Sequence, residues 1–125
     1  MARSQFKSLR KVSGGRYHSA RGKKKLELAG FSAQTKLAPE KRVRRQRMIG
    51  GHYKLSLLAL NTVNVSDKKG KTQVVEITNV VENPANPHLV RRNVITKGAV
   101  VVTKLGKVRI TSRPGQEGTI NGMLL

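Results

Sequence analysis

The sequence predicts an all-β protein, a small antiparallel β-barrel with a long, basic and largely irregular amino-terminal extension. Sixteen of the nineteen Val and Ile residues, which favour strands, lie from Leu55 onward. Residues 1–54 instead carry sixteen Lys and Arg against two acidic residues, a net charge of +14, whereas residues 55–125 carry +6. We therefore expect an extension over residues 1–38 that orders on a partner and a β-barrel domain over residues 39–125.

The first elements follow from the basic half. Residues 2–38 show no sustained helical or strand period, so this segment buries little of a face of its own. The basic run 42–48 leads through Gly50-Gly51 into the alternating run 53–57. This pattern is typical of a β-hairpin with a two-residue turn and a cationic first arm.

The remaining strands are predicted from short apolar runs between turn residues. A second hairpin is expected from residues 63–66 and 72–81, joined by a turn at 67–70. Two prolines in residues 83–87 predict a rigid loop, because proline lacks a ladder donor. Further strands are expected at 90–95, 99–104, 107–112 and 119–124. Pro114-Gly115 predicts a type II turn over 113–116, with positive φ at Gly115. Six or seven short strands in about 75 residues favour a barrel.

Several functional classes are disfavoured by composition. There are no cysteines, and the three His residues lack paired spacing, so neither disulfides nor a metal site is expected. The six acidic residues form no close pair and no nucleophile motif is present, so we predict no catalytic residue and no cofactor. A nucleic-acid-processing enzyme is the third hypothesis. No secretion signal and no membrane-length apolar run are found, which predicts a cytoplasmic protein without a membrane or small-molecule partner.

Net charge points to a nucleic acid. The total of +20 exceeds the magnitude of roughly 2–8 that solubility asks of a small domain. Dense phosphate would neutralise such clusters, and counterion release would add affinity in a salt-dependent way. Four aromatic residues are too few for stacking platforms, so recognition is expected to use backbone and shape, which favours folded RNA. The alternative is a chromatin-like architectural protein that coats duplex DNA.

The candidate RNA-contacting residues share a cationic side chain in the extension, in the first hairpin or beside a predicted loop. Arg can fork across two phosphate oxygens or stack on a base, whereas Lys acts as a point charge. The candidates are Arg3, Arg10, Lys11, Arg16, Arg21, Lys23, Lys24, Lys25, Arg42, Arg44, Arg45, Arg47, Arg91, Arg92, Lys97 and Arg113.

Three ordered blocks resemble the S8e family of small-subunit ribosomal proteins: ENPANPH at 82–88, RRNVITKGA at 91–99 and TSRPGQEG at 111–118. The blocks SGGR at 13–16 and RGKKK at 21–25, with the double glycine, are similar to the family's basic amino-terminal blocks. His52 and the segment 29–31 depart from the usual pattern. The resemblance covers almost the whole chain, and its compact length is similar to that of archaeal members.

The resemblance implies a structural protein of the small ribosomal subunit. It implies a β-barrel seated on folded ribosomal RNA and an extension that threads into the RNA. The expected partners are small-subunit ribosomal RNA and neighbouring ribosomal proteins. The expected mechanism is to clamp folded RNA through Lys and Arg contacts to phosphates.

Overall fold

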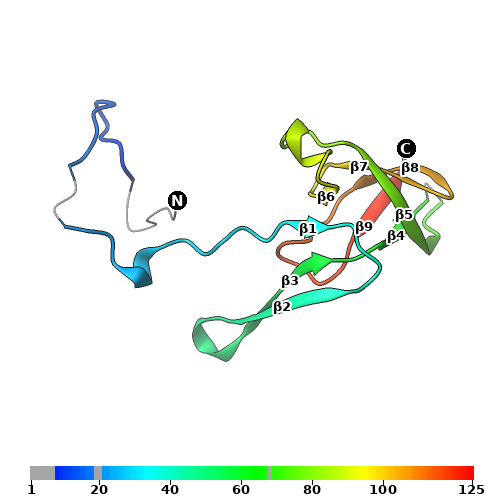
Figure 1. The fold of residues 1–125 in the computed structure, drawn as a ribbon, viewed down its shortest axis with the longest axis horizontal. Helices are drawn as coiled ribbons and strands as arrows, with labels where there is room; N and C mark the ends of the chain where they lie inside the picture. The colour runs from blue at the N-terminus through cyan, green and yellow to red at the C-terminus, as the bar shows by residue number, and fades with distance from the viewer. Residues whose placement is uncertain (1–7, 19–20, 68) are drawn as a thin grey trace. The chain divides into compact units, whose positions relative to one another are not determined.

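The computed structural model describes residues 8–18, 21–67 and 69–125 (Figure 1). The chain divides into two compact units, Met1–Ser32 and Ala33–Leu125. All nine strands assigned in the described ranges belong to the second unit, and no α-helix occurs in those ranges. The prediction of an all-β fold that contains a closed barrel is therefore confirmed.

Five strands form the closed barrel in the order β4-β5-β7-β8-β9. Four of the five pairings are antiparallel, and the barrel closes through a parallel pairing of β4 with β9, in which Asn64 lies opposite Asn121. The sequence predicted more strands in the barrel because it did not separate a second sheet. The barrel strands are β4 (Thr62–Ser66), β5 (Thr72–Glu82), β7 (Val100–Thr103), β8 (Gly106–Ile110) and β9 (Asn121–Leu124).

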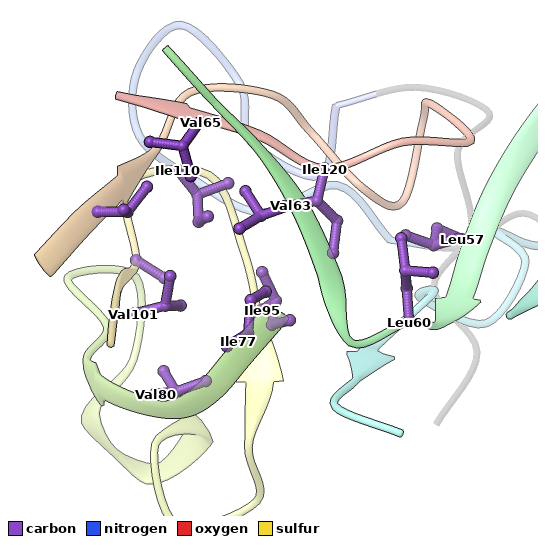
Figure 2. Close-up of a cluster of buried hydrophobic side chains, with 12 residues drawn as sticks. Leu57, Leu60, Val63, Val65, Ile77, Val80, Ile95, Val101, Ile110 and Ile120 are labelled. Carbon is purple, nitrogen blue, oxygen red and sulfur yellow. The ribbon is translucent and has the colours of Figure 1, made fainter. Parts of the chain in front are cut away.

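The barrel core is built by the alternation that the sequence displays. In β8 the buried Val108 and Ile110 alternate with exposed neighbours, and in β4 Val63 and Val65 are buried in the same way. Since successive strand residues point to opposite faces, this alternation directs one face of each strand into the barrel. Figure 2 shows the side chains of Val63, Val65, Val101 and Ile110 converging from different strands.

A second sheet lies beside the barrel strands in the same unit. Its order is β2 (Arg42–Arg47), β3 (Tyr53–Ala59), β1 (Thr35–Lys36) and β6 (Val94–Ile95). The short β1 pairs in parallel with β3 and antiparallel with β6. Strand β1 was not predicted, since two residues give no period to detect.

The first hairpin differs from its prediction at the turn. Arg47 pairs with Tyr53, and Met48 N–H donates to His52 O at 2.7 Å, which leaves three residues in the loop and not two. These residues form the 3-10 turn η2 (Ile49–Gly51). Gly50 and Gly51 both have φ near +80°, a conformation that L side chains rarely adopt. The glycine pair is therefore required by the backbone conformation of this three-residue loop and not by a two-residue turn.

Three further predictions are corrected by the structure. The strand predicted at 90–95 is reduced to β6, because residues 90–93 form a turn that follows η3 (Pro87–Leu89) and contains Asn93 at φ +49°. The last strand starts at Asn121 and not at residue 119. Gly115 is not among the positive-φ glycines, which excludes the type II turn. Gln116 and Glu117 N–H both donate to Arg113 O instead.

The first unit has little regular structure in its described ranges, 8–18 and 21–32. A tight turn is closed by an isolated antiparallel bridge between Arg10 and Arg16, and Gly14 adopts a φ of +82° within it. The 3-10 turn η1 (Lys25–Glu27) follows and buries none of its residues. The first unit thus presents its basic residues on local turns.

Candidate nucleic-acid interface

The longest cationic surface in the described structure is strand β2, in which four of six residues are Arg. Every residue of β2 is exposed, although it pairs along its length with β3. Strand β3 changes character halfway, because its first three residues are exposed while Ser56 and Leu57 are buried. The outer part of the hairpin is therefore a two-stranded ribbon accessible on both faces (Figure 1).

The strand register divides this ribbon into two chemically different faces. Directly opposed residues of an antiparallel pair lie on the same face of the sheet. The polar face thus carries Arg44 opposite Ser56 and Gln46 opposite Lys54. The stacking face carries the other outer pairs, Arg45 opposite Leu55 and Arg47 opposite Tyr53.

Two of the hairpin arginines have side-chain partners within the protein. Arg42 forms an ion pair with Glu40 at 2.8 Å, and both side chains are largely exposed. The Arg45 guanidinium carbon lies 3.6 Å from the centroid of the Tyr53 ring, well inside the range of a cation–π contact. The charge of Arg42 is therefore partly neutralised by Glu40, whereas Arg45 keeps its charge and its side chain is oriented by the Tyr53 ring.

The extension presents Arg10, Lys11 and Arg16 around one turn. Lys11 N–H donates to Gly15 O at 2.8 Å, and the Arg10 guanidinium donates to Gly14 O at 2.8 Å. The Lys11 ammonium also lies 5.5 Å from the centroid of the Tyr17 ring. All three cations are exposed on this turn.

The other candidates of the extension lie near η1. Arg21 forms an ion pair and hydrogen bond with Glu27. Lys23, Lys24 and Lys25 are exposed and follow one another without an acidic neighbour until Glu27. They form a compact cationic run next to one internally paired Arg. Arg3 lies outside the described residues.

The proline loop positions a third group of cations. Asn83 is buried, and its side chain donates to Val94 O at 3.3 Å and accepts from Thr96 Oγ1 at 3.0 Å. Asn86 Oδ1 accepts from His88 N–H at 2.9 Å, which caps η3. This hydrogen-bonded loop leads into the exposed pair Arg91-Arg92.

The candidates beyond the loop are exposed but differ in their partners. The Arg92 guanidinium donates to Gln34 Oε1 at 2.7 Å, which ties it to the segment before β1. Lys97 follows β6, and Arg113 precedes the buried Pro114. Pro114 O accepts from Leu57 N–H at 2.9 Å, which places this turn beside β3.

The structure gathers the predicted cations into local groups. Arg42, Arg44, Arg45 and Arg47 share one strand, while Arg91 and Arg92 lie in one loop. Strands β1 and β3 separate the hairpin's outer strand β2 from β6 in the sheet order. The sequence therefore identified groups of cations, and the fold places the arginines of β2 and the pair Arg91-Arg92 before β6 at opposite edges of one sheet.

Four exposed cations on strands were missed by sequence reasoning, the first of which is Lys36 of β1. Lys54 lies opposite Gln46 on the polar face of the hairpin. Lys107 and Arg109 alternate with the buried Val108 and Ile110, so they lie on the outer face of the barrel. The Lys-Val-Arg-Ile alternation in the sequence could have identified the last two, because a period of two places the charges on the face opposite the core.

Other kinds of site find no support in the described part of the chain. No group of three or more His and acidic side chains there could hold a metal ion. A search of the same residues for a helix long and apolar enough to cross a membrane finds none. The cationic surfaces are the features that call for a ligand.

A closed barrel, a cationic β-ribbon and a basic segment before them define a small, basic β-barrel protein of the kind that faces a polyanion. Comparison with known proteins specifies the family. The model of the family Ribosomal protein S8e matches residues 4–125. The chain therefore belongs to the ribosomal protein S8e family, which is not an enzyme family.

Relatives from archaea agree over nearly the full length. The small ribosomal subunit protein eS8 of Methanocorpusculum labreanum is 52% identical over 122 residues, 97% of each chain. The protein of the same name from Methanobrevibacter smithii is 50% identical over 126 residues and covers both chains completely. That of Methanococcus aeolicus is 45% identical, over 97% of this chain and 95% of its own. This agreement confirms the resemblance seen in the sequence and does not favour the chromatin-like alternative.

Proposed function

We propose that this protein is a structural constituent of the small ribosomal subunit and that it clamps folded ribosomal RNA through Lys and Arg contacts to phosphates. The single observation that carries the proposal is strand β2, which is exposed along its length and has Arg at four of six positions. The proposal is supported by membership of the S8e family and by the names of the relatives, which place those relatives in the small ribosomal subunit.

The two parts of the chain contribute differently to this proposed function. The hairpin is held by its sheet, so its arginines meet RNA with little further ordering of the backbone. The extension carries cationic runs and has no buried residue in its described ranges before β1, 8–18 and 21–32, and we expect this part of the chain to order on the RNA as it binds. The sixteen predicted cations are the proposed contacts, and neighbouring ribosomal proteins are the proposed additional partners.

Salt dependence provides the test. We would replace Arg44, Arg45 and Arg47 with Gln and measure the affinity for small-subunit ribosomal RNA over a series of salt concentrations. Each phosphate contact that is lost should lower the slope of log K against log salt by about 0.7–0.9, so the triple variant should lose roughly two units or more. Replacement of Lys23, Lys24 and Lys25 should lower the slope by a similar amount.

The control removes the same charge from a surface that the proposal does not use. Lys69, Lys71 and Lys104 are exposed on turns of the barrel, and their replacement by Gln should leave the slope close to that of the unchanged protein. If all three triple variants lower the slope equally, net charge and not a defined surface governs binding. Equal affinity for duplex DNA and for ribosomal RNA of matched length would contradict the proposed RNA specificity.

A further inference from the structure

The stacking face of the hairpin has a geometry that phosphate binding does not require. The Arg45 guanidinium carbon lies over the Tyr53 ring at 3.6 Å from its centroid, which is close to the contact distance of stacked planar groups. Tyr53 is 55% exposed and Arg45 is exposed as well, so the stack is accessible to solvent. Contact with a phosphate does not require a ring beside the guanidinium, whereas continuation of a stack onto a base does.

The position of the stack is fixed by its neighbours. Leu55 lies opposite Arg45 on the stacking face. Leu55 also packs against the loop that precedes β9, because a Cβ placed on Gly118 would lie 3.3 Å from Leu55 Cδ1. The inner end of the stacking face is therefore anchored to the barrel unit, while the outer end at Tyr53 is open. Such preorganisation lowers the ordering cost of binding a planar group.

We propose that the Arg45–Tyr53 stack binds an unstacked nucleobase of the RNA, which continues the stack on the outer face of the guanidinium or on the open part of the ring. This inference rests on the proposed RNA binding and adds a substrate class to it, RNA that carries an unpaired, displaced base. Arg planes and aromatic rings both stack on splayed-out bases. The polar face of the same ribbon, with Arg44 and Lys54, binds the flanking phosphates.

The structure offers an internal contrast for this assignment. The Lys11 ammonium lies 5.5 Å from the Tyr17 ring centroid, so both units hold a cation near a tyrosine. An ammonium is a compact charge without a plane, and it cannot extend a stack. Of these two cation–π contacts in the described residues, only that of Arg45 has a planar cation on which a base can stack.

Bulged RNA gives a direct measurement. The probes are two hairpin RNAs that differ only in one unpaired 2-aminopurine, a base whose fluorescence falls when it stacks. The unchanged protein should bind the bulged RNA more tightly and quench its fluorescence. The protein has no Trp, so its own emission does not obscure the probe. The preference should lie roughly in the range of 5- to 140-fold, which corresponds to one base–aromatic stack.

Substitutions separate stacking from charge. Arg45→Lys keeps the charge but loses the plane, and Tyr53→Leu loses the ring without any change in charge, so each should remove most of the preference and the quenching. Tyr53→Phe retains the ring and should retain the preference. Arg44→Lys, the matched exchange on the polar face, should affect the bulged and the paired RNA alike. None of these four variants should lower the salt slope by more than a fraction of one contact.

The outcomes distinguish this inference from the proposed function. If the protein binds both RNAs equally with a steep salt slope, RNA clamping stands and the base site is refuted. The same conclusion follows if Tyr53→Leu and Arg45→Lys keep the full preference. If neither RNA shows salt-dependent binding, the proposed function itself is refuted. Loss of the preference in Tyr53→Leu with unchanged affinity for the paired RNA would exclude misfolding of the hairpin as the cause.

Discussion

Gly122 occupies the most tightly packed glycine position of the barrel. It lies in β9 opposite Ile110 of β8 on one side and Val65 of β4 on the other, where the barrel closes. A Cβ at this position would lie 2.5 Å from Val108 Cγ1 and 3.1 Å from Arg109 O. Carbon atoms in favourable contact are about 3.5–4.0 Å apart, so the first contact would overlap by about 1 Å.

The surroundings of Gly122 cannot easily move aside. Val108 is fully buried and β-branched, which restricts its χ1 angle, and the second contact is with a backbone oxygen. Overpacking of this kind typically costs about 1–3 kcal/mol, against a total stability of roughly 5–15 kcal/mol. We expect Gly122→Ala to lower the free energy of unfolding by that amount.

Urea denaturation of the full chain measures this effect. With an m-value of about 1–3 kcal/mol/M, the midpoint should fall by roughly 1 M while the m-value stays constant. Gly115→Ala is the control, since its Cβ would come no closer than 3.4 Å to Ala33 O, an ordinary contact. It should change stability little.

A double substitution tests the steric reason. Val108→Ala removes the atom that the new Cβ would meet, so the double variant Gly122→Ala/Val108→Ala should be more stable than the sum of the single effects predicts. The steric reason is refuted if the effects of the two substitutions on the free energy of unfolding simply add. It is also refuted if Gly122→Ala is as stable as the unchanged protein.

Two buried polar side chains, Asn83 and Thr35, give further predictions for the same assay. Asn83→Ala should lower the free energy of unfolding by about 1–3 kcal/mol, because it leaves Val94 O and Thr96 Oγ1 without their buried partner. A smaller loss would show that water replaces the amide. Thr35→Val keeps the shape of the side chain but removes the hydroxyl that donates to Leu57 O at 2.6 Å. The free energy of unfolding should therefore also fall by about 1–3 kcal/mol, and an unchanged midpoint would refute a structural role for that bond.

The barrel was predictable from the sequence because its strands combine a period of two with short turns. The alternation in β4 and β8 matches their burial residue by residue. The turn at residues 90–93 was not predictable in this way, because the apolar Leu89-Val90 resemble the start of a strand. Asn93 adopts positive φ there, which Asn tolerates better than most residues, and the chain enters β6 only at Val94.

The sequence predicted which cationic residues form the candidate site but not how their side chains are arranged. The arginines of β2 are evident in the sequence, but their division into two faces depends on the register with β3. That register includes an irregularity, since Arg42 pairs with Ala59 and Val43 with Leu57, which no local pattern indicates. The few aromatic residues argued against stacking, and only the fold brings Arg45 over Tyr53.

Leu57 explains how a marginally sized barrel can hold an exposed ribbon in a fixed direction. Its side chain is fully buried, its N–H donates to Pro114 O at 2.9 Å, and its carbonyl accepts from Thr35 Oγ1 at 2.6 Å. Both backbone groups of one residue thus bind segments other than β2, so the inner end of the ribbon is held from two sides. In the proposed function, the hairpin would therefore meet RNA as a preformed element, whereas the extension would bear its ordering cost on binding. For this reason, loosening the Leu57 anchor should weaken RNA binding by the hairpin even though the Leu57 side chain is fully buried.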